Sequence, residues 1–177
     1  WQDRLAVLGE TADLKLLQER VAVARTKYET LARKLSVART KAAKQLGGDV
    51  SRVMQQLALG GGKFEIGLLP VEEGGAYGFE QIEFRIAGLA GDASRPLAKV
   101  ASGGELSRIS LAIEVAALGL DAVPTMVFDE VDTGVSVRAA QRVAEKLAKL
   151  SRTRQVLCVT HLPQLAAMAD THFGVEK

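Results

Sequence analysis

Two adjacent carboxylates follow an apolar segment in the second half of the chain. Residues 125–128 read Thr-Met-Val-Phe and predict a buried strand, and Asp129 and Glu130 come directly after it. An aspartate there can hold Mg²⁺ beside phosphate oxygens, and a glutamate one residue later can deprotonate an attacking water. Because apolar strands ending in Asp-Glu are common, this pair alone leaves a nucleotide site and an ordinary strand end both open.

A serine and two glycines precede another predicted element. Ser102, Gly103, Gly104 and Glu105 stand at the start of a helix expected over about residues 104–118. Glycines let the backbone approach an anion closely, and the free amides and dipole of a helix start favour phosphate. The same residues are typical of a serine N-cap with a glycine turn, so both interpretations stand for this motif by itself.

A histidine and an aspartate extend the pattern. His161 follows an apolar strand expected over residues 155–160, and Asp132 lies in the polar turn of residues 131–134. Such a histidine can donate to a phosphate oxygen, although a lone histidine is more often a structural hydrogen-bonding group. Taken in order, Ser-Gly-Gly-Glu, strand-Asp-Glu, Asp-turn and strand-His indicate the second half of an ABC-type ATPase site. The conjunction is far more specific than any single member.

The ATP-cradling P-loop is missing from the chain. Gly60-Gly61-Gly62-Lys63 resembles its end, but Leu57 stands where the first glycine belongs, and Phe64 where Ser or Thr would reach Mg²⁺. This stretch predicts a turn, and no other stretch supplies the motif. Together with a start at Trp1 rather than at a methionine, this predicts a fragment of a longer protein.

A long helical arm is expected before these motifs. Its apolar residues recur at alternating spacings of three and four, which predicts a coiled-coil segment over residues 1–46. Gly47-Gly48 is expected to end this helix, and a short helix over residues 50–59 to follow. The apolar seam consists of Leu14, Leu17, Val21, Ala24, Tyr28, Leu31, Leu35, Ala38 and Ala42.

Residues 47–177 are expected to form an α/β body. Alternation over residues 63–68 and 82–86 predicts a β-hairpin, with a long glycine-rich loop over residues 72–78. Short apolar strands and helices then alternate, which favours an α/β sheet whose functional residues lie at the carboxyl ends of strands. Besides the elements named above, we expect a helix over about 137–150, a short helix after Pro163 and a last strand near 172–175.

The charges are unevenly distributed. Residues 14–46 carry nine Lys or Arg against two Glu, whereas residues 47–177 carry thirteen basic against sixteen acidic residues. A basic helical arm would attract a polyanion such as DNA. An equally good interpretation of the same basic residues is an ordinary solvated helix face. Cys158 and the two histidines offer no zinc-ligand spacing. The chain shows no signal-peptide pattern and no apolar run near ~18 residues, which predicts a soluble intracellular protein without a membrane partner.

Three stretches together make the chain resemble the RecN family of bacterial DNA repair ATPases, within the SMC-like, ABC-type class. The signature continues as Glu-Leu-Ser-Arg, where transporter ATPases typically have Gln in place of Glu, and a His-Leu-Pro-Gln run follows the last strand. With the preceding coiled coil, the resemblance covers nearly the whole chain. The matching stretches are residues 96–108, residues 128–134 and residues 159–164.

The resemblance implies the C-terminal lobe of an ATPase head that binds ATP and Mg²⁺. Two heads would dimerise around two ATP molecules, each head completed by an N-terminal P-loop lobe across the coiled coil. Ser102, Gly103 and Gly104, with Glu105, would contact the γ-phosphate held by the opposite subunit. The remaining implied roles are Asp129 as Mg²⁺ ligand, Glu130 as catalytic base, Asp132 as the link between the two sites, and His161 as γ-phosphate sensor.

The resemblance also implies ATP-driven clamping or tethering of DNA in double-strand break repair and recombination, in the bacterial cytoplasm at the nucleoid. This chain alone is expected to be inactive because the P-loop is missing. Two departures from the family pattern are Val137, where a small residue is expected, and residues 87–91. Two alternatives are a non-catalytic coiled-coil dimerisation platform and a transporter's nucleotide-binding subunit, the latter disfavoured by the long heptad seam.

Overall fold

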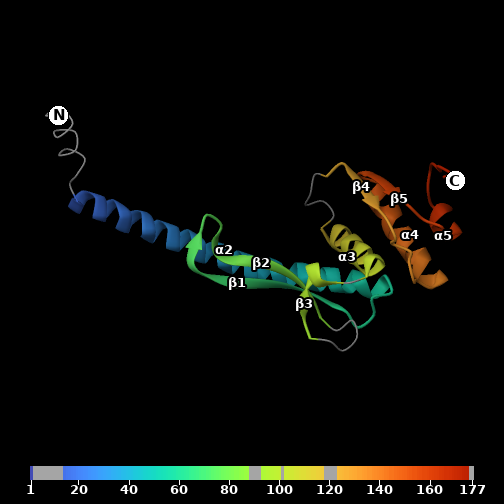
Figure 1. Ribbon diagram of the computed structural model, residues 1–177, viewed down its shortest axis with the longest axis horizontal. Coiled ribbons are helices and arrows are strands. Elements are labelled where there is room, and N and C mark those ends of the chain that lie inside the picture. The colour runs from blue at the N-terminus through green and yellow to red at the C-terminus, as the bar shows by residue number, and fades with distance from the viewer. Residues whose placement is uncertain (2–13, 88–92, 101, 118–122, 176–177) are drawn as a thin grey trace. The chain divides into compact units, whose positions relative to one another are not determined.

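The computed structural model describes residue 1 and residues 14–87, 93–100, 102–117 and 123–175. Contacts divide the chain into two compact units. The first unit comprises residues 1–41 and 68–81, and the second comprises residues 42–67 and 82–177. The division groups residues 68–81 with the arm, which the sequence did not indicate. Figure 1 shows the ribbon with its elements labelled.

One continuous helix, α2 (Leu14–Gln56), replaces the two helices expected from the sequence. The prediction of a break at Gly47-Gly48 is wrong, because tertiary contacts offset the roughly 1 kcal/mol that a helical glycine costs. A Cβ on Gly47 would lie 3.1 Å from the carbonyl oxygen of Phe64, so the glycine allows a close approach. Ser51 fixes the same approach, since the Phe64 amide donates to its Oγ at 2.9 Å.

The apolar seam of α2 is only partly used in the first unit. Tyr28 contacts the hairpin, whereas Leu17, Val21 and Leu31 remain exposed. A row of exposed apolar side chains at heptad spacing is typical of a helix that pairs with a second helix.

The hairpin consists of β1 (Lys63–Gly75) and β2 (Gly78–Ala87), joined by two residues. The expected long loop over residues 72–78 is therefore wrong. Gly74 and Gly78 have φ angles of +70° and +100°, which let the strands extend to a tight turn. A short third strand, β3 (Arg95–Pro96), pairs antiparallel with β2 and is followed by the 3₁₀ helix η1 (Leu97–Lys99).

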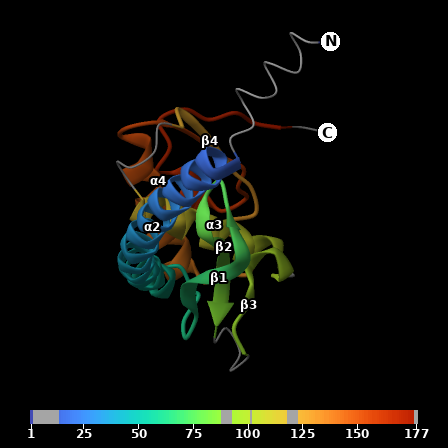
Figure 2. The same cartoon turned by 90° about the vertical axis from the view of Figure 1, so that its left-hand side faces the viewer.

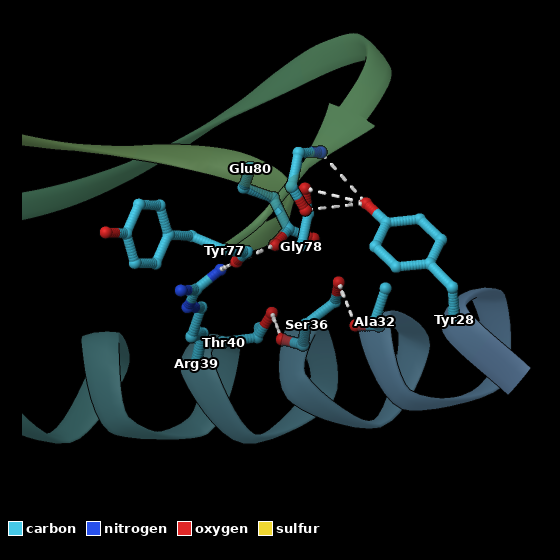
Figure 3. Close-up of polar contacts among 9 residues, drawn as sticks. Tyr28, Ala32, Ser36, Arg39, Thr40, Tyr77, Gly78 and Glu80 are labelled. Carbon is cyan, nitrogen blue, oxygen red and sulfur yellow. Dashed lines mark hydrogen bonds and ion pairs between the residues drawn. The ribbon is translucent and has the colours of Figure 1, made fainter.

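In the first unit the hairpin tip is bound to α2 (Figures 1 and 2). The Gly75 amide donates to the Tyr28 hydroxyl at 2.9 Å, and Arg39 donates to the Tyr77 carbonyl at 2.7 Å. Arg39 also pairs with Glu80 at 3.4 Å (Figure 3). These bonds satisfy backbone groups at the tip that the strand ladder leaves free.

The second unit contains the α/β elements. After α3 (Gly103–Ala116), the chain forms β4 (Thr125–Phe128), α4 (Val137–Ser151), β5 (Gln155–Cys158) and α5 (Pro163–Ala166). β4 and β5 are parallel, with Phe128 opposite Cys158, and α4 is the crossover between them. Among the described residues, the mixed α/β fold with a hairpin and an N-terminal helix agrees with the predicted fold class.

Two strand predictions need correction. The strand expected over residues 155–160 ends at Cys158, because Thr160 takes part in side-chain bonding instead of a ladder. No strand forms near residues 172–175 in the described part of the chain. Phe173 and Val175 are exposed there, and none of the described strands β1–β5 pairs with them.

The core of the second unit lies between α2, α3, α4 and one face of the β4–β5 sheet. The other face is open, since Val127 and its register partner Leu157 are 68% and 42% exposed. Within the described ranges, no helix is both long and apolar enough to cross a membrane. The largest fully buried side chains of the unit include Val50, Met54, Leu57, Ile109, Leu111, Val143 and Leu150.

Candidate functional site

Ser102 caps α3, so the structural interpretation of this motif is realised. Its Oγ accepts from the Glu105 amide at 3.4 Å, and its carbonyl accepts from the Leu106 amide at 3.0 Å. Ser102 is itself exposed, and Gly103 and Gly104 form the first helical positions. The helix N-terminus therefore keeps backbone amides and a hydroxyl at the surface, where they suit an anion.

The two glycines let the segment after β4 lie directly on α3. A Cβ on Gly103 would stand 2.5 Å from Oε2 of Glu130, and one on Gly104 would stand 3.1 Å from the Glu130 carbonyl oxygen. The Glu130 carboxylate therefore lies over the helix start, whose dipole favours a negative charge. Glu130 has a φ of +55°, a left-handed conformation that is uncommon outside glycine and often occurs at functional sites.

Asp129 is exposed at the carboxyl end of β4. Its Oδ1 accepts from the Glu130 amide at 2.9 Å, and its carbonyl oxygen accepts from Ser107 Oγ at 2.7 Å. These bonds fix the backbone and one carboxylate oxygen, and the exposed carboxylate is a hard oxygen donor. This donor chemistry fits Mg²⁺, which binds few carboxylates beside phosphate and water oxygens. In the described residues no group of three or more His, Cys, Asp or Glu could hold a metal by itself.

Asp132 links the turn after β4 to the end of β5. Its side chain is 2% exposed, and its Oδ2 accepts from the hydroxyl of Thr160. The same oxygen lies 3.6 Å from Nδ1 of His161, whose side chain is 75% exposed. Thr160 Oγ1 also accepts from the Leu162 amide at 3.1 Å, which orients the chain beyond His161.

A buried arginine of α3 binds the turn that follows β4. Arg108, 6% exposed, donates to the Thr133 carbonyl at 2.7 Å. Burial lowers the pKa of its guanidinium from the usual value, and the nearby charge of Glu105 opposes that shift. The Thr133 amide in turn donates to the Glu130 carbonyl at 3.1 Å. Arg108 thus holds the segment from Glu130 to Thr133 against α3.

Cys158 lies at the end of β5, where the charges of Asp129 and Asp132 act on its thiol. Burial raises the pKa of its thiol to about 11, and the negative charges of Asp132 and Asp129 act in the same direction. The thiol is therefore protonated and unreactive near neutral pH.

The structure brings the sequence-predicted residues together in one unit. Ser102, Gly103, Gly104 and Glu105 begin α3, Asp129 and Glu130 lie over it, and Asp132 reaches His161. The stretch of residues 60–63 forms a turn, with the Gly61 amide donating to Gln55 Oε1 at 3.1 Å, as predicted. Of the two departures from the family pattern, Val137 is exposed at the start of α4, and residues 88–91 lie outside the described part.

Sequence reasoning missed three residues of this network. Ser107 and Arg108 stand in the signature continuation, and Thr160 precedes the predicted histidine. All three positions lay inside motifs that were recognised. The only feature of the sequence that pointed to them was a polar side chain close to a predicted site residue. That feature does not reveal which groups they bind.

Comparisons with known proteins identify the family and agree with this fold. No family model matches the chain. It is 52% identical over 183 residues to the DNA repair protein RecN of Xylella fastidiosa strain Temecula1, covering 99% of this chain and 33% of that protein. The chain thus spans about a third of the length of the curated relatives it matches.

Solved structures show the same fold. The Smc head domain with a coiled coil and joint from Pyrococcus yayanosii is similar with a TM-score of 0.61 at 22% identity, covering 95% of this chain and 31% of that one. An SMC ATPase studied for ATP-driven dimerization and DNA-stimulated activation has a TM-score of 0.50 at 23% identity, covering 81% and 83% of the two chains. From the signature, the Asp-Glu pair, the SMC-type head fold and the match over nearly its whole length, the chain belongs to the RecN family.

Proposed function

We propose that this chain is the C-terminal lobe of an ATPase head, with residues 1–46 as arm and residues 47–177 as lobe. Its head would clamp or tether DNA during double-strand break repair and recombination in the bacterial cytoplasm, at the nucleoid. The observation that carries the proposal is the position of Asp129 and Glu130 at the carboxyl end of β4, in the same unit as the Ser102-capped start of α3. The relatives named DNA repair protein RecN support the repair context.

The site residues divide the work of ATP hydrolysis. Glu130 would take a proton from the attacking water, and His161, held by Asp132, would donate to the γ-phosphate. Ser102, Gly103, Gly104 and the Glu105 amide would bind the phosphate of an ATP carried by the opposite head. Mg²⁺, bound through Asp129, would neutralise charge that develops on the phosphate oxygens.

The open face of the β4–β5 sheet supports a second lobe as partner. Parallel sheets are normally covered on both faces, yet Val127 and Leu157 are exposed here. We assign the N-terminal P-loop lobe to this face and to the sheet edge. Without that lobe the chain lacks most contacts to the bound phosphates, so alone it would not hydrolyse ATP.

Dimerisation of ATP-engaged heads and contact with DNA belong to the same proposal. The similarity to an SMC ATPase described for ATP-driven dimerization and DNA-stimulated activation supports both. The basic arm of residues 14–46 is one surface that could track phosphates without reading bases, in a strongly salt-dependent way.

The test joins this chain to its P-loop lobe and compares the parent with Glu130→Gln and Glu73→Gln. Glu73 is an exposed hairpin glutamate and serves as the matched control. We expect the parent and Glu73→Gln to hydrolyse ATP, and Glu130→Gln to lose hydrolysis while forming ATP-dependent dimers.

The alternative, a non-catalytic dimerisation platform, is favoured by the exposed seam residues Leu17, Val21 and Leu31. It predicts association that is independent of nucleotide. If the joined lobes elute as dimers in gel filtration with or without ATP and never hydrolyse it, the platform replaces the ATPase.

A further inference from the structure

Helix α4 carries a basic outer face on an otherwise acidic body. Residues 137–152 contain five basic side chains and one acidic one, whereas the rest of residues 47–177 contains eight basic and fifteen acidic side chains. The body's net negative charge therefore hides a local positive region. The five basic residues are Arg138, Arg142, Lys146, Lys149 and Arg152.

Three of these cations form what we name the α4 outer row: Arg138, Arg142 and Lys149. The opposite side of the helix is buried, with Ala140, Val143 and Leu150 inside the core, while the outer row is exposed. The row spans about 16 Å at roughly 1.5 Å per residue. Phosphates of one DNA strand advance about 3.4 Å per nucleotide, so the row matches about five of them.

The positive charges of the outer row are not paired with acidic side chains in the described part of the chain. Among residues that the structure describes, none of its three cations forms an ion pair, whereas Arg39 and Arg154 pair with glutamates. Beside the row lies an open depression of about 460 Å³ lined by Gln56, Arg138, Gln141, Arg142 and Glu145. Two guanidinium groups and two amides in one depression are donors suited to a phosphate group.

We propose that the α4 outer row is a DNA-binding surface of the head lobe, which contacts the phosphate backbone. This rests on the proposed function, because it names a surface on the head rather than on the arm. The proposed contacts go to phosphates, which carry no sequence information, so binding should be independent of base sequence. Glu145 lies on the same outer face and opposes binding by its charge.

The experiment measures duplex DNA binding by fluorescence anisotropy, using the full chain alone and joined to its P-loop lobe. The first variant is Arg138→Gln/Arg142→Gln/Lys149→Gln, and the second is Glu145→Gln. We expect the triple variant to bind at least tenfold more weakly at about 0.1 M salt, with a salt slope shallower by up to about 2.7. We expect Glu145→Gln to bind about two- to fivefold more tightly.

The matched control removes three positive charges elsewhere on the lobe, as Lys63→Gln/Arg95→Gln/Lys99→Gln. This variant should bind within about threefold of the parent, and circular dichroism should show all variants folded. Arg138→Lys/Arg142→Lys retains the charge and should retain binding even if the triple variant folds poorly.

Two outcomes overturn the proposal. In the first, the outer-row triple variant binds as the parent does or loses no more than the matched control. In the second, the parent fails to bind duplex DNA. ATP hydrolysis without DNA is measured on the same proteins and should be unchanged in the outer-row variant. A parent that binds DNA through the row but never hydrolyses ATP would contradict the proposed ATPase function. It would still support the α4 outer row as a DNA-binding surface.

Discussion

Oδ2 of the buried Asp132 lies 3.6 Å from Nδ1 of the exposed His161, and the same oxygen accepts from the hydroxyl of Thr160. One carboxylate therefore positions the end of β5 relative to the turn after β4. Because the Asp132 carboxylate is buried and contacts Thr160 and His161 of the same chain, we expect it to act mainly by orienting the His161 imidazole.

Asp132→Ala should lower ATP hydrolysis by the joined lobes about 10²-fold, because a misplaced catalytic group costs about that much. The KM for ATP should change little. Thr160→Ser retains the hydroxyl and should hydrolyse ATP within about threefold of the parent. A folded Asp132→Ala protein with parental kcat would show that the contact has no catalytic role.

Gly103→Ala should abolish hydrolysis without unfolding the lobe. The new Cβ would stand 2.5 Å from Oε2 of Glu130, and the carboxylate, as the end of a flexible side chain, would move away. Gly60→Ala is the control, since open space surrounds that position. Steady-state hydrolysis and thermal unfolding together test this, and a fully active Gly103→Ala enzyme would contradict the role given to Glu130.

Arg108→Ala should lower the free energy of unfolding by about 2–4 kcal/mol, because it leaves a cavity and an unpaired Thr133 carbonyl. Lys44→Ala removes an exposed cation on α2 and should change stability by no more than about 0.5 kcal/mol. Urea unfolding measures both, and equal effects would mean that the Arg108 contact contributes nothing to the fold.

Gly48→Ala should stabilise the chain by about 0.5–1 kcal/mol, since Gly48 is helical and nothing lies within 4 Å of its added Cβ. Gly47→Ala should stabilise less or destabilise, because its Cβ would meet the Phe64 carbonyl oxygen at 3.1 Å. Thermal unfolding of the two single variants compares adjacent positions in one helix. A destabilised Gly48→Ala would argue against a continuous α2.

Cys158 should be alkylated very slowly by iodoacetamide at pH 8, because with a pKa of about 11 only about one thiol in 10³ is ionised. The rate should rise about tenfold per pH unit up to pH 10. Since the folded state holds this proton more tightly than the unfolded state, the free energy of unfolding should fall as pH rises from 9.0 toward about 11. The control is the urea-unfolded chain, which should react rapidly at pH 8.

Short-range patterns predicted the motifs well and the element boundaries less well. Ser102 as a helix cap and Asp129 directly after a strand follow from neighbouring residues, so both were predictable. The predicted burial of that strand is wrong within the described residues, since Val127 is 68% exposed. The continuation of α2 through Gly47-Gly48 was not, because it depends on a contact with Phe64, which is thirteen residues beyond Ser51 and further still from the two glycines. The two-residue turn of the hairpin likewise depends on Tyr28 and Arg39, which bind its tip from α2 (Figure 3).

The sequence by itself determined the class of fold and the order of the site motifs, since apolar period and residue type are local properties. Only the tertiary structure decided which side chains meet. It placed the Glu130 carboxylate over Gly103, joined Asp132 to Thr160 and His161, and assigned Arg108 to Thr133. The physical reason is that such contacts join residues about 25–30 positions apart, and their geometry depends on how α3, α4 and the two strands pack around a shared core.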